Sequence, residues 1–267
     1  MNLEKAVHYI QTRGNDQVRA RLHYILTGER PSTAQLQDFF SDQMPSGGFP
    51  DVIADEYDGI GATCYELASA EQMGLEADEP IVARMLQFLL RRQRADGRFG
   101  EEEEIGEFAA EWNMPGSLPA ELQLTASAGY WLALFKQREA AWRAAQFLLQ
   151  HLNIVDETFE TFAYGRWLAG ALWWQLGLHG SAEIVFETLR EDVLKMNNSS
   201  RARLLSELLL AGVPRDHWLV QAAVARLETM QEEDGSYYAY ANIDEYTTLE
   251  VVHGLLLFYG GPTSEDI

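Results

Sequence analysis

Residues 93–99 have the sequence QRADGRF and follow a strongly helical segment, IVARMLQFLLRR. The same spacing of glutamine, glycine and an aromatic residue occurs at residues 43–49 (QMPSGGF) and 231–237 (QEEDGSY). Glycine at this point is expected to end the first helix through a turn with positive φ. The glutamine is expected to bond free groups at helix ends, and the aromatic ring to pack beside the turn. Because an apolar helical pattern follows each copy after a loop, the three copies indicate a repeated helix–turn–helix unit.

The distances between the copies fit a chain built from six such units. The copies begin 50 and then 138 residues apart, and 138 is three times 46. Two degenerate units would fill the longer gap, and the helical periodicity supplies them. The predicted hairpins pair residues 2–12 with 15–27, 33–42 with 57–74, 79–93 with 120–135, 138–152 with 160–177, 181–196 with 199–212, and 216–231 with 246–259.

The two helices of each hairpin differ in character. First members, such as residues 78–93 (DEPIVARMLQFLLRRQ), carry more charge and have one polar face. Second members, such as residues 123–135 (QLTASAGYWLALF), are poor in charge and rich in small residues, which is typical of buried helices. We therefore predict a single all-α domain over residues 1–267, an (α/α)6 toroid of six helical hairpins with inner and outer rings. An open solenoid shares the local pattern and is the alternative.

Composition limits the classes of partner. The chain has 41 acidic and 20 basic residues and a net charge of −21, which disfavours binding to nucleic acid, anionic membranes or a diphosphate. No apolar run is long enough for a membrane span, and the opening MNLEKAVHYIQTRG lacks the order of a signal peptide. The single cysteine, Cys64, excludes an internal disulfide framework. These features predict a cytoplasmic protein.

The repeat resembles the QW-type motif of terpenoid cyclases and protein prenyltransferase β-subunits. Three segments carry the resemblance: residues 39–51 (FFSDQMPSGGFPD), 88–102 (FLLRRQRADGRFGEE) and 227–240 (LETMQEEDGSYYAY). The resemblance implies an α/α toroid that binds an apolar, isoprenoid-type small molecule in its central cavity. It also allows a cyclase or isomerase activity.

The chain departs from the catalytic signatures of that superfamily. The D-x-D-D motif of the cyclases is absent, and the nearest acidic cluster is Asp55-Glu56-Tyr57-Asp58. The zinc site of the prenyltransferases has a D-x-C motif, whereas Asp58 and Cys64 are six positions apart here. Thr247 stands where the family has its histidine ligand. We therefore predict no metal and no cofactor.

Polar residues that begin the inner helices are expected to converge at one mouth of a toroid. The candidate catalytic residues are Asp55, Asp58, Glu121, Glu160, Asp244 and Glu250, and Glu245 belongs to the same group of converging polar residues. Two close carboxylates could share a proton and supply a general acid. Acidic residues in a first helical turn are equally explained as caps. Glu250 cannot be a cap because it lies inside an apolar helix.

A second group of candidates would contact the substrate. Aromatic faces can stabilise a carbocation, stack on sugar rings or fill a core. The candidate substrate-binding residues are Trp112, Tyr130, Trp131, Tyr164, Arg166, Trp167, Trp173 and His253. The insertion at residues 100–119 is long enough to form a lid that includes Trp112, while its acidic run at 101–104 is expected to be solvated.

Two other functions stay open at this point. A glycan-active protein would combine paired carboxylates with tryptophans, as unrelated (α/α)6 toroids do. A non-catalytic interaction module, able to form a homodimer, would explain the loss of both catalytic signatures of the superfamily.

Overall fold

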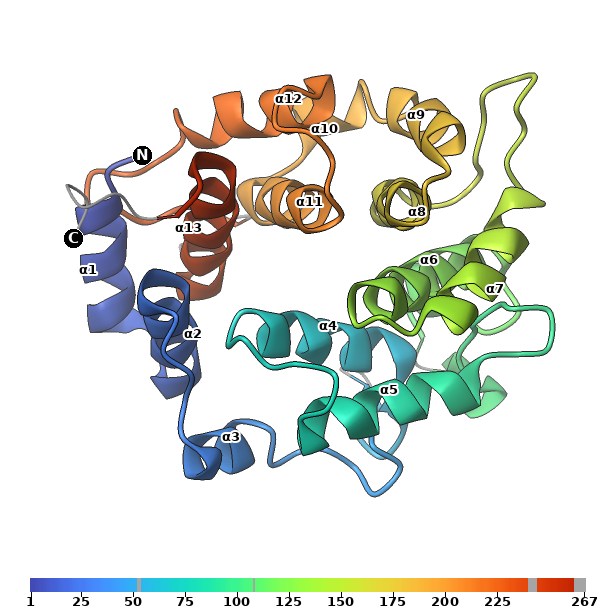
Figure 1. Cartoon of the computed structure of the whole chain (residues 1–267), viewed down its shortest axis with the longest axis horizontal. Coiled ribbons are helices and arrows are strands. Elements are labelled where there is room, and N and C mark those ends of the chain that lie inside the picture. The colour runs from blue at the N-terminus through green and yellow to red at the C-terminus, as the bar shows by residue number, and fades with distance from the viewer. Residues whose placement is uncertain (52–53, 108, 240–243, 262–267) are drawn as a thin grey trace. The chain divides into compact units, whose positions relative to one another are not determined.

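The computed structural model describes residues 1–51, 54–107, 109–239 and 244–261. In these ranges the chain is all-helical apart from two very short strands (Figure 1). Each range predicted to be a helix overlaps one, except that residues 181–196 overlap two, α9 and α10. The α-helices are α1 (Leu3–Arg13), α2 (Asp16–Thr27), α3 (Thr33–Phe39), α4 (Ile60–Glu71), α5 (Pro80–Arg92), α6 (Leu118–Leu134), α7 (Arg138–Leu149), α8 (Ala163–Gln175), α9 (His179–Glu187), α10 (Asp192–Lys195), α11 (Asn198–Leu210), α12 (Trp218–Leu227) and α13 (Glu245–Tyr259). None of the helices in the described ranges is both long and apolar enough to cross a membrane.

The chain divides into two compact units that interleave in sequence. The first contains Met1–Ser32, Gln72–Gly74 and the described residues from Arg190 onward, and the second contains Thr33–Glu71 and Leu75–Leu189. The single domain predicted over residues 1–267 stays a prediction.

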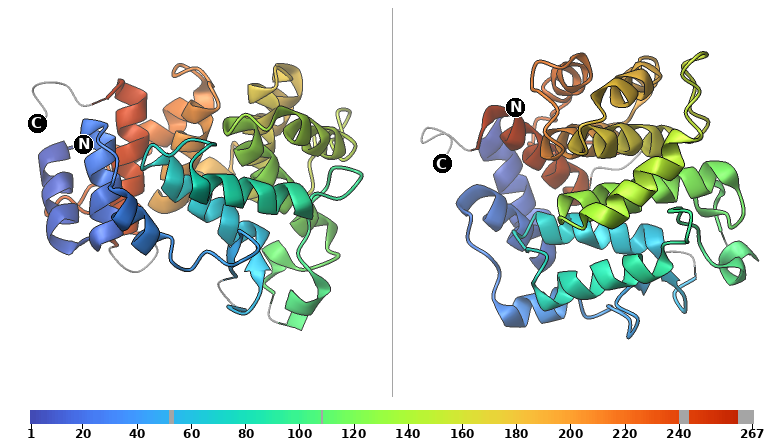
Figure 2. Two further views of the ribbon diagram at one scale, coloured as in Figure 1. Left: turned by 60° about the horizontal axis from the view of Figure 1, so that its bottom comes forward. Right: turned by 45° about the vertical axis from the view of Figure 1, so that its right-hand side comes forward.

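In the second unit, α4, α6 and α8 pack against one another in succession (Figure 2). The helix α5 packs against α4, α7 packs against α6 and α8, and α9 packs against α8. Every residue of α6 from Ala120 to Leu132 is buried, whereas α5 buries only one face. The predicted contrast between apolar and amphipathic helices is therefore present in this unit.

In the first unit, α13 packs against α11, α1 and α2, and α12 packs against α11 (Figure 1). Leu3, Ile10, Leu22, Leu249 and Val252 belong to the buried apolar cluster of this unit. The two ends of the described chain thus share one core.

The three turn motifs have the same geometry. The glycines have φ of 92° at Gly47, 94° at Gly97 and 96° at Gly235, as predicted. Each packs directly on the backbone of a neighbouring helix, so that an added Cβ would overlap a carbonyl of Arg84, Arg143 or Lys5, respectively. The turn therefore requires glycine for its φ and also for this close approach.

The glutamine bonds both its own turn and the start of a neighbouring helix. Its Nε2 donates to the carbonyl of the glycine four positions later, over 3.0 Å from Gln43 and 3.1 Å from Gln93 and Gln231. It donates a second time to the beginning of a helix, at Ile81, Ala140 and Asn2, over 3.0, 2.9 and 2.9 Å. Oε1 of Gln231 also accepts the N–H of Asn2, the N-cap of α1, over 2.6 Å. The glutamine therefore joins its turn to the start of another helix.

The residue after the turn fixes the next buried helix. The backbone N–H of the aromatic residue donates to a threonine Oγ1 in that helix: Phe49 to Thr63 over 3.1 Å, Phe99 to Thr125 over 2.8 Å, and Tyr237 to Thr248 over 3.1 Å. The rings of Phe49, Phe99 and Tyr237 are buried, as expected from the sequence. One repeat therefore specifies three contacts: glycine on backbone, glutamine on a helix start, and aromatic N–H on threonine.

Candidate functional site

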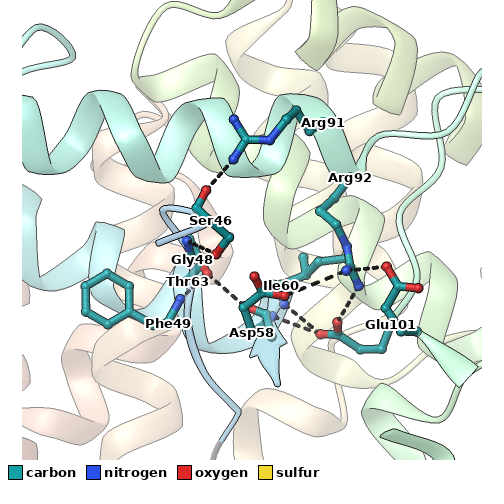
Figure 3. A network of polar contacts seen from close by, with 12 residues as sticks. Ser46, Gly48, Phe49, Asp58, Ile60, Thr63, Arg91, Arg92 and Glu101 are labelled. Carbon is teal, nitrogen blue, oxygen red and sulfur yellow. Dashed lines mark hydrogen bonds and ion pairs between the residues drawn. The ribbon is translucent and has the colours of Figure 1, made fainter. Parts of the chain in front are cut away.

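The candidate site lies in the second unit, at the beginning of α4 (Figure 3). Strands β1 (Phe49–Pro50) and β2 (Asp58–Gly59) pair antiparallel, with Phe49 opposite Gly59 and Pro50 opposite Asp58. This pairing holds Asp58 two positions before Ile60, the first residue of α4. Arg92 ends α5, and the turn motif that follows brings Glu101 to the same place.

Glu101 is the centre of this cluster. Its side chain is fully buried, and its Oε1 accepts the backbone N–H of Ile60 over 2.8 Å and of Gly61 over 3.2 Å. These N–H groups are among those that the first turn of a helix leaves without a partner. Within the described ranges, the buried Oε2 of Glu101 accepts no hydrogen bond. One oxygen therefore caps α4, and the other is buried without a hydrogen bond from these residues.

Arg92 is the cation of the site. Its Nη2 lies 3.6 Å from Oε2 of Glu101, which is an ion-pair distance but too long for a hydrogen bond. Its Nη1 lies 3.8 Å from Oδ1 of Asp58 and also contacts the carboxylate of Glu102. One guanidinium thus faces three carboxyl groups, as Figure 3 shows for Asp58 and Glu101.

A further buried carboxylate, Asp51, lies close by. The side chain of Asn113 donates to its Oδ2 over 3.3 Å from the short helix η2 (Glu111–Asn113). The carbonyl of Trp112 in η2 accepts a 3.3 Å hydrogen bond from Gln123 of α6. Both bonds are long, so η2 is attached to the site by weak polar contacts.

The electrostatic balance raises the pKa of Glu101 to about 7. Burial is the main cause, and the charge of Asp51 adds to it. The backbone N–H of Gly61, the charge of Arg92 and the backbone N–H of Ile60 act in the opposite direction. Glu101 can therefore hold or release a proton near neutral pH, which is the property that a general acid or base needs.

This geometry corrects one expectation from the sequence. The acidic run at residues 101–104 was expected to be solvated, but Glu101 is buried while Glu102, Glu103 and Glu104 are exposed. The insertion also has structure of its own, in η1 (Glu103–Glu107) and η2. Its first residues are held by the turn motif, so the run does not behave as a uniform solvated stretch.

The other candidate carboxylates of the second unit lie outside this cluster. Asp55 is exposed in the turn that precedes β2, and Glu160 is exposed before α8. Glu121 is buried in the first turn of α6, where Arg94 lies 3.2 Å and Arg98 2.9 Å from its carboxylate oxygens. Among the predicted catalytic residues, Asp58 is the one that the structure brings to Glu101.

The candidate aromatic residues are mostly packed in the core. Tyr130, Trp131, Trp167 and Trp173 are buried, and the Trp173 indole donates to the carbonyl of Ala145 over 3.3 Å. Tyr164 is half-buried and meets Trp167 edge to face with 4.9 Å between ring centroids, while Arg166 donates to the carbonyl of Thr188 over 2.9 Å. Trp112 differs because 56% of its surface is exposed.

The remaining candidates belong to the first unit. Asp244 caps α13, accepting the N–H of Thr247 over 2.8 Å, and Glu245 follows it as the first residue of the helix. Glu250 forms a buried ion pair with Arg21 over 2.8 Å, and Gln72 donates to its other oxygen over 3.1 Å. Burial lowers the pKa of His253 to about 4, against the opposing effect of Glu250, so its ring is neutral at neutral pH.

Sequence reasoning missed Glu101, Arg92 and Asp51, although one signal was present. Asp51 and Glu101 each stand eight positions after the glutamine of their own turn motif. Equivalent positions in two repeats therefore carry the two buried carboxyl groups of the site. Within the described ranges, no cluster of three or more histidine, cysteine or acidic residues is arranged to hold a metal ion.

No protein-family model matches the chain, and no curated protein matches it. Among solved structures, the chain is similar to the crystal structure of a protein from Actinoplanes, with a TM-score of 0.54 and 16% sequence identity. The similarity covers 97% of this chain and 98% of that one. At this identity it shows a shared fold over the whole length and nothing about activity. The repeat contacts and the buried cluster define an all-helical chain with three equivalent turn motifs and, in its second unit, a buried carboxyl–arginine cluster.

Proposed function

We propose that this chain binds an apolar, isoprenoid-type small molecule and acts on it by proton transfer, with Glu101 as the proton donor. The observation that carries the proposal is the state of this carboxyl group. Glu101 is buried, its pKa is raised to about 7, and its Oε2 accepts no hydrogen bond from the described residues. A protonated carboxylic acid in a water-poor setting is the group that acid-initiated isomerisation or cyclisation of an alkene requires.

The charges around Glu101 favour a neutral substrate. Asp51, Asp58 and Glu102 surround it, and Arg92 is the cation that faces them. An anionic group such as a diphosphate would be repelled by this excess of carboxylates. A cation that develops on a neutral substrate would be stabilised by them.

The proposed step balances with Glu101 alone. The π-electron pair of the alkene forms a C–H bond to the proton on Oε2, and the O–H bonding pair remains on the carboxylate. Positive charge then resides on the other alkene carbon. Return of a proton from a neighbouring carbon to Oε2, before or after ring closure, gives the product and restores the acid. Arg92 is placed to stabilise the carboxylate between these two events.

Because the side chain of Glu101 is buried, we propose that η2 moves to admit the substrate. The two 3.3 Å hydrogen bonds that attach η2, from Asn113 to Asp51 and from Gln123 to Trp112, are the contacts to be broken. Release of η2 would carry the exposed Trp112 with it. This segment is the lid of the proposal.

The finer architecture is also a proposal, namely that the six hairpins close into an (α/α)6 toroid. Closure is supported by the last turn motif, which contacts the start of α1 as the earlier motifs contact α5 and α7. Gln231 bonds the carbonyl of Asn2 as Gln93 bonds that of Ala140, and Gly235 packs on Lys5 as Gly97 packs on Arg143.

The test compares Glu101→Gln with Glu102→Gln, since both remove one acidic charge beside Arg92. Binding of geranylgeraniol and squalene is measured by thermal shift, and conversion of each by chromatography of the extracted products. We expect both variants to bind and only Glu101→Gln to lose conversion, by at least roughly a hundredfold. Unchanged conversion by Glu101→Gln would overturn the proposal.

A second candidate, a glycan-active protein, is favoured by one observation. Trp112 is exposed directly beside Asn113, which contacts the buried carboxylate of Asp51. An exposed indole next to paired carboxyl groups suits a sugar ring. A thermal shift with oligosaccharides and uronates, but not with neutral isoprenoids, would favour this candidate over the first.

A further inference from the structure

A second unusual group lies in the first unit, at the start of α11. Arg201 is 2% exposed, and its Nη2 donates to the carbonyl of Val193 over 2.8 Å. This carbonyl belongs to the short helix α10. Within the described ranges, the buried Nε of Arg201 has no hydrogen-bond partner. A guanidinium has five N–H donors, so most of its capacity is unused by these residues.

The charge of Arg201 is also uncompensated. None of the ion pairs among the described residues includes Arg201, and the charged group that acts on it is Arg226 of α12, a second cation. Burial lowers the pKa of Arg201, and the charge of Arg226 lowers it further. Arginine nevertheless stays protonated in proteins. A buried positive charge without a counter-charge is strongly unfavourable.

Arg226 has no ionic partner in the described ranges either, and it is exposed. The helices α11 and α12 lie side by side (Figure 1), which brings the first turns of α11 toward the end of α12. The backbone N–H groups at the start of α11 add positive potential there. This arrangement is unexpected in a chain with 41 acidic and only 20 basic residues.

We propose that Arg201 and Arg226 form a binding site for a small oxyanion, a phosphate or carboxylate group, on the α11–α12 hairpin. The anion would accept from Arg201 in the interior and reach Arg226 at the surface. It would supply the counter-charge that the described residues do not give. The site lies in the first unit, whereas Glu101 lies in the second, and the anion is proposed as an effector or a second recognition element and not as the substrate of the proton transfer.

The experiment measures the thermal stability of the full chain in increasing inorganic phosphate, citrate or acetate, with chloride at matched ionic strength as the reference. We expect a saturable rise of several degrees with phosphate or with a carboxylate, beyond the effect of chloride. A rise in stability with phosphate alone, or with a carboxylate alone, shows which of these two anions the site binds. Titration calorimetry with the same anion then gives its affinity.

Three variants locate the site. Arg226→Gln should weaken binding at least about tenfold, because one of the two charge-assisted contacts is lost. Arg201→Met should abolish the response, and in chloride it should be more stable than the unmodified chain because an unpaired buried charge is removed. Arg138→Gln is the matched control: it removes an exposed arginine of α7, in the other unit, and should leave the response unchanged.

The proposal is overturned if no anion stabilises the chain more than chloride does. It is equally overturned if Arg226→Gln and Arg138→Gln respond like the unmodified chain, since the effect would then be a general one of ionic strength. Because Arg226 is exposed, its variant tests the site even if Arg201→Met does not fold.

Discussion

At the scale of single residues, the molecule contains charged groups in the interior whose environments differ. Arg21 is paired with Glu250 and Gln72, Glu101 is only partly compensated by Arg92, and Arg201 has no counter-charge among the described residues. The first arrangement is structural, because every contact is made within the protein. A proton or a ligand is expected at Glu101 and Arg201, whose charges are compensated only in part or not at all by the described residues.

The Arg21–Glu250 pair should be costly to break from one side. Glu250→Ala leaves Arg21, which is 1% exposed, buried without its carboxylate, and we expect a loss of about 3–5 kcal/mol in the free energy of unfolding. The double variant Arg21→Met, Glu250→Leu should recover most of this loss. Urea unfolding measures both. The exposed pair Asp16–Arg19 is the control, and Asp16→Ala should lose less than about 1 kcal/mol.

The interpretation of Glu250 changes if the outcome is reversed. A loss below about 1 kcal/mol for Glu250→Ala would show that the pair does not stabilise the core. Glu250 would then return to the list of groups free for catalysis.

Glu101 should make stability depend on pH. Its pKa in the folded chain, about 7, lies above the ordinary value of 4.5, so its contribution is fully present below pH 4.5 and is lost as the pH rises through 7. Glu101→Gln, which resembles the protonated acid, should therefore be more stable than the unmodified chain at pH 8, by on the order of 3 kcal/mol. At pH 4 the two should be nearly equal. Unfolding curves at both values check this, and lower stability of the variant at pH 8 would contradict it.

At the scale of elements, the repeated turn explains why helices with unremarkable sequences pack in a defined way. Glutamine, glycine and the aromatic N–H each make one type of contact, and the three copies agree. The glycine is the most demanding of these, because both its φ and the space at its Cα exclude a side chain.

Gly97→Ala should separate these two demands when compared with Gly116→Ala. Gly97 has φ of 94° and packs on the carbonyl of Arg143, whereas Gly116 has φ of 73° and no atom within 4 Å of the position of an added Cβ. We expect Gly116→Ala to lose about 1–2 kcal/mol from backbone strain alone. Gly97→Ala should lose more, because α7 must also move away. Equal losses, measured by thermal unfolding, would show that the close approach is unimportant.

The helices and the repeat could be predicted from the sequence because both are local patterns. The positive φ of Gly97 and the buried ring of Phe99 follow from the turn motif itself. The partner of Gln93 could not be predicted, because it lies on α7, 47 residues away. Glu101 was misjudged for a related reason: four consecutive glutamates look equivalent in sequence, and only the turn that precedes them makes the first one buried.

At the scale of the whole molecule, the central architectural question is whether the chain closes on itself. The last turn motif packs on α1, so the N-terminal helix receives the contact that α5 and α7 receive from the earlier copies. The contact lies within the first unit, and the proposed toroid requires it, whereas an open solenoid does not.

Gly235→Ala should test closure. If the last turn is equivalent to the others, this variant should lose as much stability as Gly97→Ala, and hydrogen exchange should accelerate in α1 (Leu3–Arg13) as well as in α13. The same substitution should leave exchange in α7 unchanged. Acceleration limited to the loop around residue 235 would contradict a closed chain.

The most direct test of the proposed acid–base centre is a 13C NMR titration of the glutamate side-chain carboxyl groups, with Glu101→Gln used to assign the resonance. We expect one carboxyl resonance that titrates near pH 7. This resonance should be absent in Glu101→Gln and present in Glu102→Gln. A Glu101 resonance that titrates near the ordinary value of 4.5 would contradict the account, because the carboxyl would then be ionised at neutral pH and would have no proton to donate.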